Sequence, residues 1–413
     1  MRKMKDSGIE WIGEIPEEWE IKRLKAVLCE RNESNNPIKT DYILSLTNDR
    51  GVIPYDEKGD VGNKSKEDVS GYKIAYPNDI VLNSMNVIIG SVALSKYYGC
   101  VSPVYYMLYL RNPEDDIRYY NYIFQTKEFQ SKLKGYGNGI MEIRMRIQML
   151  KLNTVDLPIA DFDTQHRIAD YLDNKCGKID RYIETQRAII EKLKAYKQAV
   201  ITENIEKNNK KTISLRRCII NIEQGWSPPA ADQVNERLGW SVLSLSAVKH
   251  GEFNNNAKKS IDINADIPYI LELHNNDFLM TRSNTRELVG DVCIVENCSP
   301  RIIFSDLIYR ISFKDEISIK YMRYVMLSSY VRQQIQEKAR GSSGTMPKIS
   351  HKSIKEIYVP LPDAEQQREI VVLLDEICDK IDQAIIRRKI IIDKLTEYKK
   401  SLIYEVVTGK REV

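Results

Sequence analysis

The sequence predicts an α/β protein with a pseudo-twofold internal duplication. Two globular mixed α/β domains are joined by two long helices that form an antiparallel intramolecular coiled coil. Three observations support this fold class: the chain repeats itself, each repeat ends in a long proline-free stretch with heptad spacing, and the rest of each repeat holds short strand-like runs. The predicted segments are a first domain over 1–156, a central helix over 157–207, a second domain over 208–358 and a C-terminal helix over 359–413.

The repeat is clearest in the two predicted helices. Residues 158–203 and 360–405, at an offset of 202, are identical at 19 of 46 positions without a gap. The duplication continues more faintly outside this block, where Tyr119 and Tyr122 fall on Tyr321 and Tyr324. Both halves should therefore share one fold while their surface chemistry differs.

Heptad spacing predicts that the two helices pair. A 3–4 alternation of apolar residues runs for about four heptads, which is typical of a coiled coil. Polar residues interrupt it at matched places, Gln186 and Lys197 in the first helix and Arg388 and Lys399 in the second, which favours a fixed register. The alternative is two separate amphipathic helices, each packed on its own domain. The predicted seam consists of Leu172, Ile179, Ile183, Ile190 and Leu193 in the first helix, and Leu374, Ile381, Ile385, Ile392 and Leu395 in the second.

Composition excludes several classes of protein. No run of 18 apolar residues is present, so no transmembrane helix is expected, and the polar start does not resemble a signal peptide. Seven scattered cysteines and four histidines predict a cytoplasmic protein with neither a disulfide framework nor a metal site. The net charge of +4 is small for a nucleic-acid binder, so any basic surface must be local.

The variable region of each half reads as strands, then one helix, then a glycine-rich loop. The expected strands are 42–46, 79–82, 91–94 and 104–110 in the first half, and 240–245, 277–280, 291–295 and 302–311 in the second. The expected helices are 117–134 and 319–339, and the glycine loops are 135–139 and 341–344.

No catalytic motif stands out. The glycine loops follow a helix, whereas a dinucleotide-binding loop follows a strand and opens a helix. The sequence has no GxxxxGK[ST] and no Asn/Asp-Pro-Pro-aromatic tetrapeptide, and its four histidines do not recur at matched positions. We therefore expect neither catalytic residues nor a bound cofactor in this chain.

Positive charge gathers beside the glycine loops. Residues 323–355 carry a net charge of +6 and residues 121–153 carry +4. Backbone amides of such loops can approach phosphates, and arginine or lysine can read guanine edges. A solvated polar loop is the alternative. The candidate DNA-binding residues are Asn83, Ser84, Asn86, Gly137, Asn138, Arg144 and Arg146 in the first half, and Arg282, Ser283, Asn284, Arg286, Arg340, Ser342, Ser343, Lys348 and Lys352 in the second.

Three segments resemble the specificity subunits of type I restriction–modification systems: the opening stretch 7–19 (SGIEWIGEIPEEW), the stretch 361–367 (LPDAEQQ) and the ending 407–411 (VTGKR). The duplicated architecture resembles that family over the whole chain. The start of the first helix departs from the family pattern, because it lacks the second proline and the Glu-Gln pair.

The resemblance implies that each domain binds one half of a split double-stranded DNA site, while the helices set the gap. It also implies that the helices dock two methyltransferase subunits and, through them, restriction subunits. S-adenosylmethionine, ATP and magnesium would then belong to these partners. Other interpretations are a non-catalytic coiled-coil scaffold, an enzyme with an unrecognised site, and a silent subunit that serves only as a recombination donor in an inverting locus.

Overall fold

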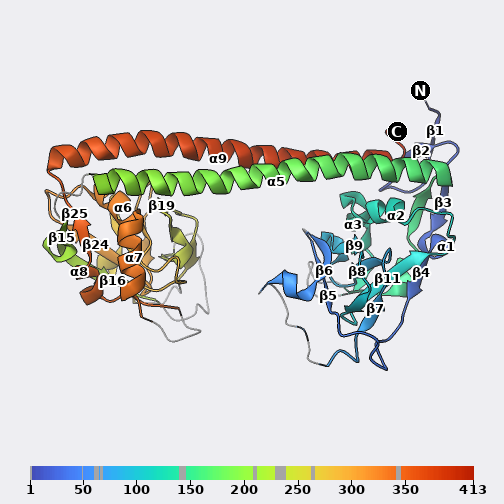
Figure 1. Ribbon diagram of the computed structural model, residues 1–413, viewed down its shortest axis with the longest axis horizontal. Helices are drawn as coiled ribbons and strands as arrows, with labels where there is room; N and C mark the ends of the chain where they lie inside the picture. The colour runs from blue at the N-terminus through green and yellow to red at the C-terminus, as the bar shows by residue number, and fades with distance from the viewer. Residues whose placement is uncertain are drawn as a thin grey trace. The chain divides into compact units, whose positions relative to one another are not determined.

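The computed structural model describes residues 2–413 except 49, 60–64, 66–67, 139–145, 208–211, 228–238, 262–265 and 341–345. It divides into two compact units (Figure 1). Unit 1 comprises Met1–Gln186 and Lys389–Val413, and unit 2 comprises Arg187–Arg388. Two long helices, α5 (Phe162–Lys207) and α9 (Ala364–Val407), each contribute residues to both units. The first domain is the globular part of unit 1, and the second domain is the globular part of unit 2.

A four-stranded antiparallel sheet lies at the centre of the first domain, in the order β4-β11-β8-β9. Its strands are β4 (Leu28–Arg31), β8 (Ile80–Asn83), β9 (Val92–Leu94) and β11 (Tyr105–Leu110). The shorter pairs are β1 (Met4–Asp6) with β2 (Glu14–Pro16), β3 (Glu20–Arg23) with β14 (Asp156–Ile159), β5 (Leu44–Thr47) with β6 (Gly51–Pro54), β7 (Lys73–Ala75) with β10 (Gly99–Val101), and β12 (Gly137–Asn138) with β13 (Arg146–Ile147). The helices are α1 (Leu24–Val27), α2 (Ile117–Phe124), α3 (Lys127–Lys134) and α4 (Met149–Leu152), and α2 and α3 lie between the sheet and α5 (Figure 1).

The second domain repeats this plan. Its antiparallel sheet has the order β16-β24-β21-β22, with strands β16 (Ile219–Gln224), β21 (Phe278–Thr281), β22 (Val292–Ile294) and β24 (Ile308–Phe313). A second sheet joins β17 (Ser241–Leu243) to β20 (Lys258–Ser260) and, in parallel, to β23 (Ile302–Phe304). The remaining pairs are β15 (Thr212–Ser214) with β25 (Tyr358–Pro360) and β18 (Val248–Lys249) with β19 (Glu252–Phe253), and the helices are α6 (Ile319–Leu327), α7 (Ser329–Lys338) and α8 (His351–Lys355).

Three of the predicted elements are wrong in extent. The single helix expected over 117–134 is two helices, because the Thr126 hydroxyl donates to the carbonyl of Ile123 and also accepts from the next helix's first turn, which starts a new helix there. The helix expected over 319–339 breaks at the matched Ser328, whose hydroxyl donates to the carbonyl of Val325. The run 302–311 is also two strands, because a turn closed by Ile308 separates β23 from β24.

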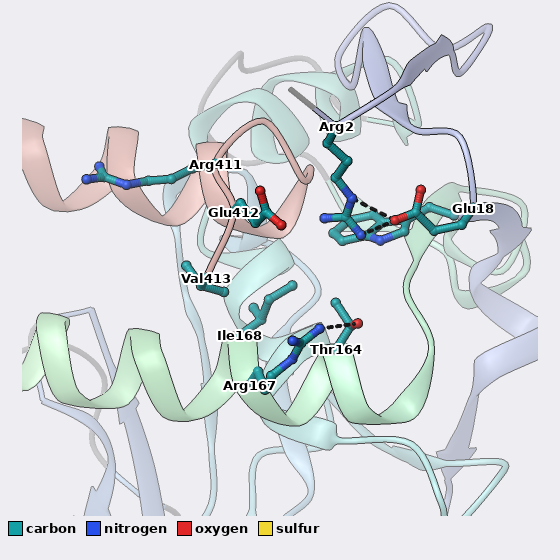
Figure 2. A pocket seen from close by; sticks show the side chains of 9 residues that line it. Arg2, Glu18, Thr164, Arg167, Ile168, Arg411, Glu412 and Val413 are labelled. Atoms are coloured by element: carbon teal, nitrogen blue, oxygen red, sulfur yellow. Dashed lines mark hydrogen bonds and ion pairs between the residues drawn. The ribbon is translucent and has the colours of Figure 1, made fainter.

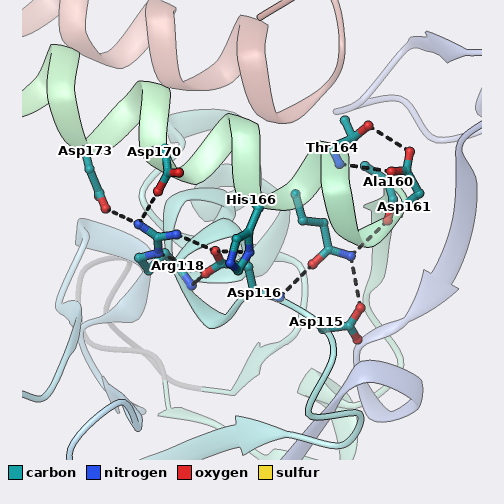
Figure 3. A network of polar contacts seen from close by, with 10 residues as sticks. Asp115, Asp116, Arg118, Ala160, Asp161, Thr164, His166, Asp170 and Asp173 are labelled. Carbon is teal, nitrogen blue, oxygen red and sulfur yellow. Dashed lines mark hydrogen bonds and ion pairs between the residues drawn. The ribbon is translucent and has the colours of Figure 1, made fainter.

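Matched hydrogen bonds fix each domain to the helix that follows it. In unit 1, Gln165 near the start of α5 accepts from the Asp116 amide at 3.0 Å and donates to the carbonyl of Ala160 at 2.9 Å (Figure 3). In unit 2, Gln367 accepts from the Ser318 amide and donates to the carbonyl of Pro362, both at 3.0 Å. Both glutamines are buried, so each carboxamide satisfies backbone groups that would otherwise be unpaired.

Charged side chains extend this junction. The Arg118 guanidinium reaches Asp116, Asp170 and Asp173 at 2.6 to 2.8 Å, and the ring nitrogen Nδ1 of His166 lies 2.9 Å from Asp116 (Figure 3). The Tyr122 hydroxyl donates to Asp173 at 2.6 Å, as its mate Tyr324 does to Asp375. The repeat therefore preserves the contacts by which the domain holds its helix.

The long helices pack on one another within each unit. In unit 1 the start of α5 and the end of α9 share one core, which includes Leu172 and Leu402. In unit 2 the end of α5 and the start of α9 do so, with Val200 and Leu374. The start of one helix meets the end of the other, so the pair is antiparallel, and the predicted fold class is confirmed.

The seam residues divide into two groups. Leu172, Ile183, Ile190, Leu374, Ile381 and Ile385 are buried, whereas Ile179, Leu193, Ile392 and Leu395 are half-buried. Two of the polar residues that interrupt the heptad spacing, Lys197 and Lys399, form ion pairs with the opposite helix. Lys399 Nζ lies 2.7 Å from Asp180 in unit 1, and Lys197 Nζ lies 2.6 Å from Asp382 in unit 2. Each lysine thus holds the opposite helix in register.

Candidate nucleic-acid interface

In the second domain, two segments predicted to bind DNA lie side by side. The stretch 282–286 follows β21 directly, and the carbonyl of Arg282 accepts from the Ile349 amide at 2.9 Å. Ser283 forms a β-bridge with Lys348, and Lys348 forms another with Arg340. The Arg340–Lys348 bridge is antiparallel and forms the base of a hairpin, so the backbones of both polar segments meet at one edge of the domain.

The charged side chains at this edge differ in their constraints. Arg340, Lys348, Lys352 and Arg286 are exposed. Arg282 is only about one quarter exposed, and its Nη1 lies 3.2 Å from the carbonyl oxygen of Asp306 and 3.9 Å from the carboxylate. A partly immobilised guanidinium loses less rotamer entropy when it binds a base than a free one does.

The cations of this edge affect the pKa of His351. Its ring packs against Tyr309 with centroids 4.6 Å apart, and the Tyr309 hydroxyl donates to the carbonyl of Ile349. Burial lowers the pKa of His351, and the charges of Lys355 and Arg282 lower this pKa further. His351 is exposed at this edge and adds no charge of its own at neutral pH.

Two cations counted in the basic window have internal roles. Burial lowers the pKa of Arg332, whose Nη2 donates at 2.8 Å to the carbonyls of Glu287 and Val289. Arg323 lies 3.1 Å from Asp375 on α9. The count of charges along the sequence therefore overstates the basic surface, because Arg332 anchors the loop after β21 from behind and Arg323 holds α9.

The first domain has the same framework with different side chains. The carbonyl of Ser84 accepts from the Ile147 amide at 3.0 Å, as that of Arg282 does from Ile349. Asn138 pairs with Arg146 where Arg340 pairs with Lys348. The hydroxyl of Tyr106 donates to the carbonyl of Ile147, which matches the bond from Tyr309.

Two predicted contacts need correction. The Ser84 side chain is fully buried and its hydroxyl donates at 2.7 Å to the carbonyl of Val104. Ser283 is 1% exposed, because its backbone lies in the bridge with Lys348. Neither hydroxyl is presented at the surface, so we remove both side chains from the candidate interface.

The other candidates have varied surroundings. Asn83 and Asn86 are half-buried, and the Asn83 carboxamide accepts from the Met85 amide, which shapes the turn after β8. Asn284 is 9% exposed and accepts from the amide of Thr285. Arg146 is exposed, and Gly137 and Asn138 form β12. Arg144, Ser342 and Ser343 lie outside the described residues.

Sequence reasoning missed several residues that build this edge. Tyr106 and Tyr309 support the hairpin base, and Leu150 is exposed on α4 at the position that Lys352 occupies on α8. The repeat could have revealed Leu150, because it falls on Lys352 at the offset of 202.

A separate cavity of about 240 Å³ lies in unit 1, beside the start of α5 (Figure 2). Arg2 pairs with Glu18 there, and Arg167 donates to the Thr164 hydroxyl at 3.0 Å. The lining arginines and glutamates nearly balance in charge, so this cavity lacks the positive excess of the two edges. Its lining residues are Arg2, Glu18, Trp19, Thr164, Arg167, Ile168, Arg411, Glu412 and Val413.

The described parts of the chain contain no group of three histidine, cysteine, aspartate or glutamate residues that could hold a metal ion. All seven cysteines are free thiols. No helix within the described ranges is both long and apolar enough to cross a membrane.

The duplicated scaffold, with two long helices and an equivalent edge on each domain, defines a class of helix-linked two-domain proteins. The family described as type I restriction modification DNA specificity domain matches residues 16–195 and 230–391. These ranges cover more than half of the chain, which therefore belongs to this family. The chain is a DNA specificity subunit of the type I restriction–modification class, in which this subunit is not the catalytic one.

Named relatives agree with this assignment. The chain is 22% identical to the type I restriction enzyme MjaVIII specificity subunit of Methanocaldococcus jannaschii over 97% of this chain and 94% of that protein. It is 26% identical to the EcoEI specificity subunit of Escherichia coli, over 40% of this chain but 28% of that protein. A solved structure described under "complex assembly and conformational transition of the type I R-M system" has the same fold, with a TM-score of 0.68, 14% identity, and coverage of 96% of this chain and 99% of that one.

Proposed function

We propose that each domain binds one half of a bipartite DNA site through the edge formed by its hairpin base and the turn after β8 or β21. The observation that carries this proposal is the repeated bond from Ile147 to Ser84 and from Ile349 to Arg282, which gives both domains one framework with different side chains. A shared framework with exchanged side chains suits two domains that read different sequences. Phosphate contacts would position each domain, and side chains at the edge would read bases.

Two linked half-sites make the protein a bivalent binder. Each domain then binds weakly alone, while the pair binds tightly because the second contact is intramolecular. Helix α5 has 46 residues and is therefore about 69 Å long. We propose that the helices set the number of unread base pairs between the half-sites.

The helices also suit two copies of one partner. Tyr196 and Tyr398 occupy matched positions on α5 and α9, and both are about half exposed. Exposed tyrosines are frequent anchors at protein interfaces. We propose that two methyltransferase subunits dock on these equivalent helix surfaces and that restriction subunits join through them. S-adenosylmethionine, ATP and magnesium then act in those partners.

Methylome sequencing tests this function. The chain is co-expressed with its methyltransferase subunit in a host that lacks other methylation, and a strain without the chain serves as the control. A split methylated motif with a fixed gap is the expected result. Methylation at a contiguous motif, or a methylome identical to that of the control, contradicts the proposal.

A further inference from the structure

The two domains differ most at one matched place on the edge. The backbone bonds Ile147 to Ser84 and Ile349 to Arg282 put the two frameworks in register. In the second domain the side chains around this bond include Arg282 and Lys352. In the first domain the same positions hold Ser84, which is fully buried, and Leu150, which is 79% exposed.

Helix α4 is attached to the core through another residue, so Leu150 is not needed to hold it in place. Helix α4 is a single turn, and its Leu152 is fully buried. The fold is therefore already anchored by Leu152, whereas Leu150 projects into solvent. A leucine side chain is unfavourable in water by about 1.5–3 kcal/mol relative to a buried one, so a ligand that covers it gains binding energy.

Met85 adds a second apolar side chain at this place. It directly follows Ser84 and is 36% exposed, whereas its mate Ser283 is buried in the bridge with Lys348. Met85 lies one residue from Ser84 and Leu150 lies three residues from Ile147, so each apolar residue is close in sequence to one end of the same backbone bond. Arg146, one residue before Ile147, is exposed as well. One cation next to two apolar groups matches a DNA groove edge, where phosphates lie beside base substituents.

In the major groove of DNA made of the four standard bases, thymine alone presents a methyl group, and proteins recognise it by apolar contact. We propose that the first domain reads a thymine methyl through Leu150 and Met85, while the matched position of the second domain relies on charged side chains. This inference rests on the proposed function and adds the chemistry of one half-site. The first half-site must then contain an A·T pair within reach of this edge.

Deoxyuridine substitution tests the proposal, because uracil lacks only the methyl group. The assembled complex with its methyltransferase subunits is titrated with a duplex carrying the motif found by methylome sequencing. The first half-site is identified as the half whose recognition falls in Arg146→Ala. Replacing the contacted thymine there by deoxyuridine should weaken binding about fourfold, the equivalent of one buried methyl.

Leu150→Ala should weaken binding to the thymine duplex and make binding insensitive to deoxyuridine. Deoxyuridine in the second half-site should have no comparable effect. Specific binding that is unchanged by every deoxyuridine in the first half overturns the inference and leaves the proposed function intact. Leu150→Ala could instead lose the methyltransferase subunit and remain sensitive to deoxyuridine. That result assigns Leu150 and Met85 to a protein partner and also overturns the inference. If the complex binds no duplex specifically, both this inference and the proposed function are wrong.

Discussion

Replacement of Arg282 by alanine should weaken recognition of one half-site only. The guanidinium is about one quarter exposed and lies at the base of the basic edge of the second domain. A bidentate arginine–guanine contact contributes about 1–3 kcal/mol to discrimination, which corresponds to about 5- to 150-fold in affinity. The ion pair with Asp306 is partly exposed and 3.9 Å long, so its loss should cost the fold about 0.2–1 kcal/mol. The binding defect should therefore exceed the stability defect.

The assay is fluorescence anisotropy of the assembled complex on three duplexes: the full site, a site with the first half scrambled and a site with the second half scrambled. Arg282→Ala should bind the full site no more tightly than the duplex scrambled in the second half. It should still bind the full site more tightly than the duplex scrambled in the first half. Arg146→Ala, at the edge of the first domain, is the control and should show the reverse pattern. Equal losses at both halves would refute the assignment of Arg282 to one half-site.

Three further predictions concern individual hydrogen bonds. Arg332→Met removes two hydrogen bonds from Nη2 to loop carbonyls and should lower affinity for the second half-site about two- to tenfold. Gln130→Leu at the matched position of the first domain should leave the second half-site unaffected in the same anisotropy assay. Tyr119→Phe and Tyr321→Phe should each reduce the free energy of unfolding by about 1–3 kcal/mol in urea titrations, because each change removes the O–H donor of a buried proline carbonyl; a variant as stable as the unchanged protein would contradict this. Asp161→Ala should cost about 1 kcal/mol at neutral pH, whereas Asp161→Asn should cost a few tenths. Burial raises the pKa of Asp161, but hydrogen bonds from Thr164 outweigh it and hold the pKa below its ordinary value. The contribution is therefore complete above the ordinary aspartate pKa and disappears as the pH falls through the lower folded value; a difference from Asp161→Asn that does not shrink in acid would contradict this.

The duplication made much of the fold predictable. Apolar residues at heptad spacing predicted α5 and α9, and the aspartates before them mark the observed starts: the amide of Thr164 donates to Asp161, and that of Gln366 donates to Asp363. Lys197 and its mate were predicted as matched interruptions, but their pairing with aspartates on the opposite helix needed three-dimensional structure.

The candidate interface was only partly predictable. Local composition identified the basic segments, because cations near glycine loops are visible in sequence. It could not separate exposed from buried cations, and so it counted Arg332 with Arg340. Hydrogen bonding of Ser84 and Ser283 to nearby backbone is likewise invisible without strand register. An apolar residue carries no signal of exposure by itself, and the match of Leu150 to Lys352 in the repeat was overlooked.

Exchange of one domain tests the central claim most directly. The globular part of unit 2, residues 212–360, is replaced by the corresponding part of a family member with a different methylated motif, and both long helices are retained. Methylome sequencing should then show one half of the split motif changed, with the other half and the gap preserved. A change in both halves, or loss of the gap, would contradict the account that each domain reads its own half-site.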